Sequence, residues 1–186
     1  MTAADPINLT GGSGVSTITA ASIGSVITGG DGIDTLTAGA GADTFIFAAT
    51  AATNDADTIA SFAAADVIDV QLFATDDAPA AEVVAGSTNA VAIATNDIVL
   101  WSTSTITSFD TKTEIIAEFA AGETNGAIAA GEQVVLIIRD TAASGDSYIW
   151  YIDEASNDTT IDAAELVLVG TLTDYNTVFA DANILD

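Results

Sequence analysis

Large apolar side chains recur every nine residues near the start of the chain. From residue 11 the sequence divides into the blocks GGSGVSTIT, AASIGSVIT, GGDGIDTLT and AGAGADTFI, whose eighth positions are Ile18, Ile27, Leu36 and Phe45. Six small or polar residues predict a tight turn, and a Thr-Ile-Thr triplet predicts a short strand with its middle side chain pointing inward. Two blocks therefore predict one coil of a parallel β-roll, in which blocks eighteen residues apart stack.

The remainder of the chain predicts more strands and one helix. Residues 111–114 (Thr-Lys-Thr-Glu) form a capping-box pattern, and the apolar residues that follow predict a short amphipathic helix that Gly122 ends. The Ala/Asp-rich stretch 74–86 is interpreted as a connection. Strands are predicted where β-branched and aromatic residues gather, at 91–101, 133–139, 148–153 and 166–172.

Charge and composition exclude several classes of protein. The 186 residues include 27 acidic and 2 basic side chains, with a net charge of -25, and neither His nor Cys is present. Disulfides, thiolate or imidazole metal sites and His-dependent catalysis are therefore excluded. Two cations, Lys112 and Arg139, make no basic patch for nucleic acid. A hydrophobic content of 49% argues against an acidic disordered chain.

The nine-residue blocks place acidic side chains and glycine-rich turns together. The sixth position is Ser16, Ser25, Asp34 and Asp43 in successive blocks. Stacking sets Asp34 against Ser16 and Asp43 against Ser25, between turns whose carbonyl groups glycine leaves accessible. Hard oxygen ligands of this kind suit Ca²⁺. A glycine-rich turn array that holds no metal remains the alternative.

Residues 29–37 and 38–46 resemble the nonapeptide GGxGxDxUx of the RTX family of secreted calcium-binding proteins. Residues 57–62 and 66–70 resemble the segment that closes RTX rolls. The resemblance implies Ca²⁺ held by side chains and backbone carbonyls between stacked blocks, with one carboxylate missing wherever Ser replaces Asp. The candidate calcium ligands are Gly30, Asp31, Gly32, Asp34, Gly39, Gly41, Asp43 and Asp57.

A second acidic segment lies between the last two predicted strands. Residues 153–165 resemble a degenerate EF-hand loop, with Asp153, Asp158, Asp162 and Glu165 as weaker calcium candidates. Thr159 occupies the position where such loops need Gly for a sharp turn. A plain acidic hairpin loop is the alternative for this segment.

These patterns together predict an all-β fold. A short parallel β-roll with its closing segment is expected at 9–73, followed by a β-rich C-terminal part with one short helix at 74–186. No run of about 18 apolar residues suggests a membrane span, and the first residues lack the features of a Sec signal peptide. The RTX resemblance implies type I secretion, with its address in the acidic, apolar C-terminal tail.

The expected function is that of a secreted, non-enzymatic protein that assembles with its own copies, in a calcium-dependent way, into an extracellular layer, filament or matrix. RTX-type proteins include bacterial surface-layer proteins. The alternative is a calcium-dependent binding or secretion module of an adhesin or exoenzyme. The edge of the first coil, residues 11–28, is expected to be covered by a neighbouring subunit, or by residues 1–8 or the C-terminal part. Threonine rows of an ice-binding kind and a glycosidase-like carboxylate pair are weaker interpretations.

Overall fold

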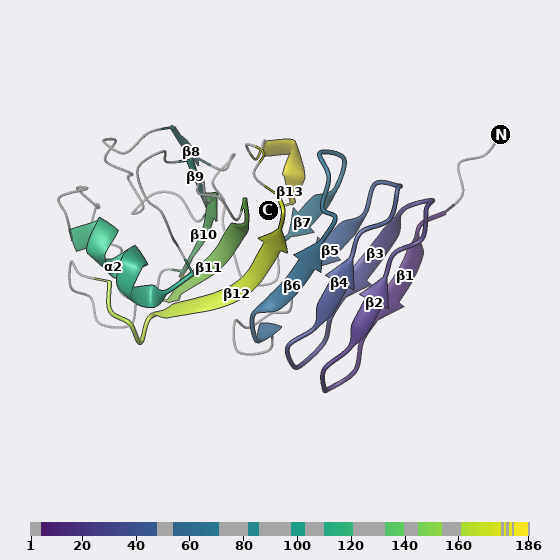
Figure 1. The fold of residues 1–186 in the computed structure, drawn as a ribbon, viewed down its shortest axis with the longest axis horizontal. Helices are drawn as coiled ribbons and strands as arrows, with labels where there is room; N and C mark the ends of the chain where they lie inside the picture. The colour runs from purple at the N-terminus through teal and green to yellow at the C-terminus, as the bar shows by residue number, and fades with distance from the viewer. Residues whose placement is uncertain are drawn as a thin grey trace.

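The computed structural model describes residues 5–47, 54–70, 82–85, 98–102, 110–120, 133–139, 145–153, 161–175, 177, 179 and 181–185. Strands dominate these residues, together with one α-helix, α2 (Lys112–Ala120), and one 3₁₀ turn, η2 (Asp181–Asn183). The expected all-β class with one short helix is therefore confirmed. Two sheets carry the fold (Figure 1).

The first sheet, sheet A, is parallel throughout. An apolar residue of each strand pairs with an apolar residue of the neighbouring strand, as Ile27 does with Phe45 and Phe45 with Ile68. In spatial order the strands are β1 (Ile7–Thr10), β3 (Ser25–Thr28), β5 (Thr44–Ile46), β7 (Val67–Asp69) and β13 (Ile184–Leu185).

The second sheet, sheet B, has a parallel half and a mixed half. The parallel half contains β2 (Thr17–Thr19), β4 (Thr35–Thr37), β6 (Asp57–Ala60) and β12 (Leu166–Thr173). The sheet then continues through β11 (Ser147–Asp153), β10 (Gln133–Arg139), β9 (Ile98–Ser102) and β8 (Glu82–Ala85). The pairs β12–β11 and β11–β10 are antiparallel, whereas β10–β9 and β9–β8 are parallel.

The N-terminal chain alternates between the two sheets, strand by strand, from β1 to β7. Thr17 pairs with Thr35 and Val26 pairs with Thr44, so blocks eighteen residues apart stack as the sequence predicts. The next step is longer, because Thr35 pairs with Thr58. The segment expected to close the repeat thus supplies two further strands, β6 and β7, of the same stack. We call strands β1–β7 the N-terminal stack.

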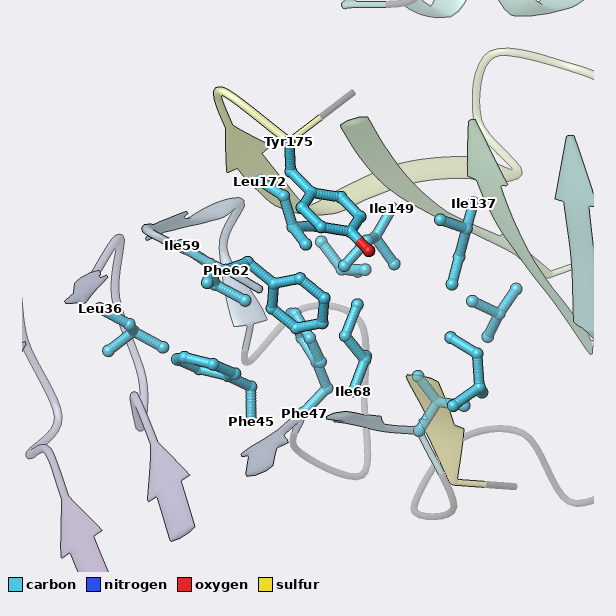
Figure 2. Packing of buried hydrophobic residues seen from close by; sticks show 14 of the residues in the cluster. Leu36, Phe45, Phe47, Ile59, Phe62, Ile68, Ile137, Ile149, Leu172 and Tyr175 are labelled. Carbon is cyan, nitrogen blue, oxygen red and sulfur yellow. The ribbon is translucent and has the colours of Figure 1, made fainter. Parts of the chain in front are cut away.

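Apolar side chains fill the space between the sheets. In sheet A the inward positions are occupied in order by Leu9, Ile27, Phe45, Ile68 and Ile184. In sheet B they are Ile18, Leu36, Ile59 and Leu172. Figure 2 shows how Leu36, Phe45, Ile59 and Ile68 from the stack meet Leu172, Ile149 and Ile137 from the C-terminal strands. One core therefore joins the predicted roll to the C-terminal part.

The C-terminal half of the chain returns to the stack. Strand β12 pairs with β6, and β13 pairs with β7, so each sheet receives a C-terminal strand at the end opposite β1 and β2 (Figure 1). Tyr175 and Phe179 pack with Phe62 at ring-centroid distances of 4.9 and 5.9 Å. Both sheets and the core therefore contain residues from each side of the domain boundary expected near residue 73.

The remaining predicted elements match closely where the structure describes them. The three antiparallel strands begin and end within one residue of the predicted ranges. Helix α2 is capped by Thr111, whose Oγ1 accepts a 3.4 Å bond from the Glu114 amide, and it buries Ile115 against a second core on the other face of β10 and β11. Residues 91–97 of another predicted strand lie outside the described residues, and β9 follows them.

One prediction for this half is wrong. The stretch 74–86 was expected to be only a connection, but it contains β8, which pairs with β9. The four residues of β8 are too few to display an apolar alternation, and partners far away in the sequence decide that they form a strand.

Candidate metal centre

A column of three side chains runs along the turns that lead into sheet B. Ser16 and Asp34 each precede a strand of that sheet, Asp57 is the first residue of β6, and the three stack one above the other. The Ser16 amide donates to Asp34 Oδ1 at 2.5 Å, and the Asp34 amide donates to Asp57 Oδ1 at 2.8 Å. Each aspartate therefore holds the preceding coil by accepting a hydrogen bond from its backbone. We call this set the first column.

The second oxygens of the two carboxylates converge beside one glycine. Asp34 Oδ2 is buried and has no hydrogen-bond partner in the protein. A Cβ atom built on Gly29 would collide with Asp34 Oδ2 and lie 2.8 Å from Asp57 Oδ2. Only glycine therefore lets this turn approach the two carboxylate oxygens so closely, and a methyl group at this position would press against both of them.

Burial and neighbouring charge make this pair electrostatically unfavourable without a cation. Asp34 and Asp57 are both buried, at 0% and 3% exposure. Burial, together with the charges of Asp34 and Asp55, raises the pKa of Asp57 to about 7, although the bond from the Asp34 amide opposes the shift. Near neutral pH, a proton or a cation bound to Asp57 would therefore relieve this unfavourable burial.

A second column lies along the turns that lead into sheet A. It contains Ser25, Asp43 and Asp66. The Asp43 amide donates to Asp66 Oδ1 at 2.9 Å, and the Ala63 amide donates to Asp66 Oδ2 at 2.8 Å. Asp43 Oδ2 accepts from the Gly39 amide at 2.7 Å, while its buried Oδ1 has no hydrogen-bond partner.

The two columns can be compared by the hydrogen bonds that their carboxylates accept. Both oxygens of Asp66 accept backbone hydrogen bonds, and Asp57 Oδ1 accepts one from the Asp34 amide. Burial and the charge of Asp43 still raise the pKa of Asp66. Each column thus contains one buried carboxylate oxygen without a hydrogen-bond partner, Asp34 Oδ2 in the first and Asp43 Oδ1 in the second.

The predicted glycine ligands lie where adjacent turns approach most closely. Gly30 and Gly32 have positive φ, and a Cβ atom on either would strike the backbone of the turn one coil earlier. Side chains on Gly39 and Gly41 would strike the turn at residues 20–24. Close packing of the turns thus accounts for these glycines whether or not a metal is bound. Asp31 is exposed, and its amide bonds Gly12 O at 3.1 Å.

Asp66 belongs with the candidate ligands but was not among the predicted ones. The sequence does contain a signal for it. Asp57 and Asp66 are nine residues apart and precede Thr-Ile and Val-Ile, which is the spacing and pattern of Asp34 and Asp43 before Thr-Leu and Thr-Phe. An insertion between residues 46 and 57 interrupts the nine-residue count and conceals the repetition.

The weaker candidates in the second acidic segment are only partly described. Asp153 is exposed at the end of β11, and Asp158 lies outside the described residues. The Asp162 amide donates to Glu165 Oε2 at 2.8 Å, and the Glu165 amide donates to Asp162 O at 3.0 Å. The described part of this segment is thus a turn closed by its own glutamate.

Within the described parts of the chain, no three acidic side chains gather closely enough to form a metal site by themselves. Calcium bound at either column would need backbone carbonyls or water in addition to the paired carboxylates. In the same parts of the chain, no helix has the length and apolar character needed to span a membrane. No protein-family model matches the sequence, and no curated protein matches it either.

Proposed function

We propose that this chain is a secreted, non-enzymatic structural protein that assembles with its own copies into an extracellular layer, filament or matrix, with Ca²⁺ as a stabilising ion. The N-terminal stack would be an RTX-like β-roll, exported by a type I system. The observation that carries the proposal is the first column, in which two buried carboxylates converge beside Gly29 and Asp34 Oδ2 has no hydrogen-bond partner.

Electrostatics supports an ion at this position. A chain with a net charge of -25 repels its own copies unless cations bind or screen it. Asp34 and Asp57 would hold the ion, and the ion would compensate the charge that burial leaves unbalanced. Because these groups are arranged only in the folded chain, calcium binding would stabilise folding.

The basic test is thermal unfolding of the full chain in EDTA and in calcium. Binding contributes RT ln(1 + [Ca²⁺]/Kd), about 2.7 kcal/mol at a hundredfold excess over Kd. We expect a higher melting temperature in calcium, whereas magnesium at the same ionic strength should have a smaller effect. Equal melting temperatures in EDTA and calcium would remove calcium from the proposal.

Two glycine-to-alanine variants test where the ion binds. Gly29→Ala places a methyl group against both carboxylates, so the calcium-dependent rise in melting temperature should disappear. Gly14→Ala is the matched control, because a Cβ atom there meets nothing within 4 Å. If both variants keep the full calcium response, the ion does not bind between Asp34 and Asp57.

Assembly is tested separately by electron microscopy of the purified protein in millimolar calcium and in chelator. Ordered layers or filaments that form only with calcium are expected. A calcium-stabilised protein that never forms ordered assemblies would instead favour a binding or secretion module of a larger protein.

A further inference from the structure

One segment at the end of this acidic molecule has no charged side chain. Residues 6–30 contain no Asp, Glu, Lys or Arg, although the whole chain carries 27 acidic residues. This segment forms β1, β2 and β3 with their turns, at the outer end of the N-terminal stack (Figure 1). The same segment contains Ser16 and Ser25, where the later coils have Asp. An uncharged segment therefore lies at one end of a strongly acidic protein.

The uncharged segment also presents open strand edges. Among the described strands, β1 and β2 are the first members of their sheets and have a partner on one side only. In β2, Ser16 O and the Ala20 amide bond to β4. Because N–H and C=O groups alternate in direction along a strand, those of Thr17 and Thr19 point away from the stack. Such groups are ready to pair with another strand.

Apolar surface accompanies these edges. Leu9 and Ile18 continue the inward stacks of the two sheets but are only partly buried, whereas Ile27 and Ile59 are 0% exposed. Val15, in the first turn, is 80% exposed. Covering this end would bury apolar surface and satisfy backbone groups in one contact.

We propose that two copies of the chain join end to end through this face, which consists of residues 7–19, around a two-fold axis. The proposal deepens the self-assembly part of the proposed function by naming its first contact. A second copy is the favoured occupant because residues 6–30 let two molecules of charge -25 meet without opposing carboxylates. Asp in place of Ser16 or Ser25 would put charge into the contact.

A two-fold arrangement follows from the difference between the two ends. At the far end, β12 already pairs with β11, so sheet B offers no free edge there. A head-to-tail contact would leave β2 without a partner. A two-fold axis across the stack lets the edges of both β1 and β2 pair at once, antiparallel to strands of the other copy, and this contact by itself joins only two subunits.

Sedimentation equilibrium of the full chain in EDTA, over a wide range of concentration, tests this dimer separately from the calcium-dependent larger assembly. We expect a mass that reaches twice 18.6 kDa and then stays constant. Val15→Asp introduces a charge at the contact in both copies and should weaken dimerisation at least tenfold. Ile33→Asp is the matched control: Ile33 lies eighteen residues later, is 58% exposed, and should leave the dimer unchanged.

Thr19→Pro provides a second variant, since it removes an outward N–H but keeps the bond from the Ala20 amide to Thr37 O at 2.8 Å. This variant should be folded by circular dichroism and monomeric by sedimentation equilibrium. A monomeric wild-type chain, dimers that persist in both variants, or a mass that grows without limit would each overturn the two-fold contact. A dimer that forms no calcium-dependent larger assembly would refute the proposed function alone, and ordered assemblies built from monomeric Val15→Asp would refute the contact alone.

Discussion

The two ends of the N-terminal stack are made from the same repeat but differ in burial, charge and hydrogen bonding. At the inner end, Ile59 and Ile68 are fully buried by β12 and β13, and Asp57 and Asp66 follow Asp34 and Asp43 in the two columns. At the outer end, Leu9 and Ile18 are only partly buried. A repeat therefore acquires its properties from the coil that stacks on it, not from its own sequence alone.

The columns show the same contrast in their chemistry. All four aspartates of the columns are buried, and Asp34 Oδ2 and Asp43 Oδ1 have no hydrogen-bond partner, which is unfavourable for a buried charge. Ser16 and Ser25 at the outer end bond locally to their own turns, through the Gly12 and Ala21 amides at 3.4 and 3.1 Å. In the two proposals, the ion is therefore assigned to the buried carboxylates and the protein contact to the outer end, where serine replaces aspartate.

The largest expected difference between the ends is in core stability. Ile59→Ala removes a fully buried side chain and should lower the free energy of unfolding by about 2–5 kcal/mol. Ile18→Ala, at the equivalent position of sheet B, should cost less than half as much in the monomer, because the side chain is only partly buried. Urea unfolding followed by circular dichroism measures both, and equal losses would contradict the contrast in burial.

A smaller difference is expected in calcium affinity. Asp34→Asn retains an acceptor for the Ser16 amide but removes a charge, and it should weaken calcium binding by about tenfold or more. Asp43→Asn should weaken it less, because backbone amides already donate to one oxygen of Asp43 and to both oxygens of Asp66. Ser16→Ala, which removes only a hydroxyl group, should weaken it least. Calorimetric titration ranks the three, and a serine effect as large as that of Asp34 would refute this assignment of ligands.

The last predicted effect is a dependence of stability on pH in the absence of calcium. The pKa of Asp57 is raised from its ordinary value of 3.8 to about 7, so the folded protein binds this proton more tightly than the unfolded chain does. The free energy of unfolding should therefore fall as pH rises from about 4 to about 7, with a slope of at most about 1.4 kcal/mol per pH unit from this group.

Two comparisons isolate the contribution of Asp57. In Asp57→Asn the slope measured in EDTA should become shallower, whereas Asp31→Asn, which changes an exposed carboxylate, should leave it as it is. Calcium should also remove much of the slope, because the ion replaces the proton. A slope that is unaffected by Asp57→Asn would assign the pH dependence to other carboxylates.

Much of this architecture could be predicted from residue spacing. The nine-residue period identifies Ile27, Leu36 and Phe45 as inward-facing, and it pairs Asp34 with Ser16 at a distance of eighteen residues. The antiparallel strands and helix α2 could also be predicted, since each has enough β-branched, aromatic or capping residues to specify it locally. In all these cases the local sequence, or a constant spacing between similar residues, is enough to predict the structural element.

Other features depend on contacts that no local pattern encodes. The insertion before Asp57 interrupts the period, so only stacking shows that Asp57 and Asp66 continue the two columns. Strand β13 has two residues and becomes a strand because β7 offers it a free edge. Whether a carboxylate is buried, and whether an edge stays open, depends on which distant segment returns to cover it, because burial and pairing belong to the assembled chain and not to any one of its segments.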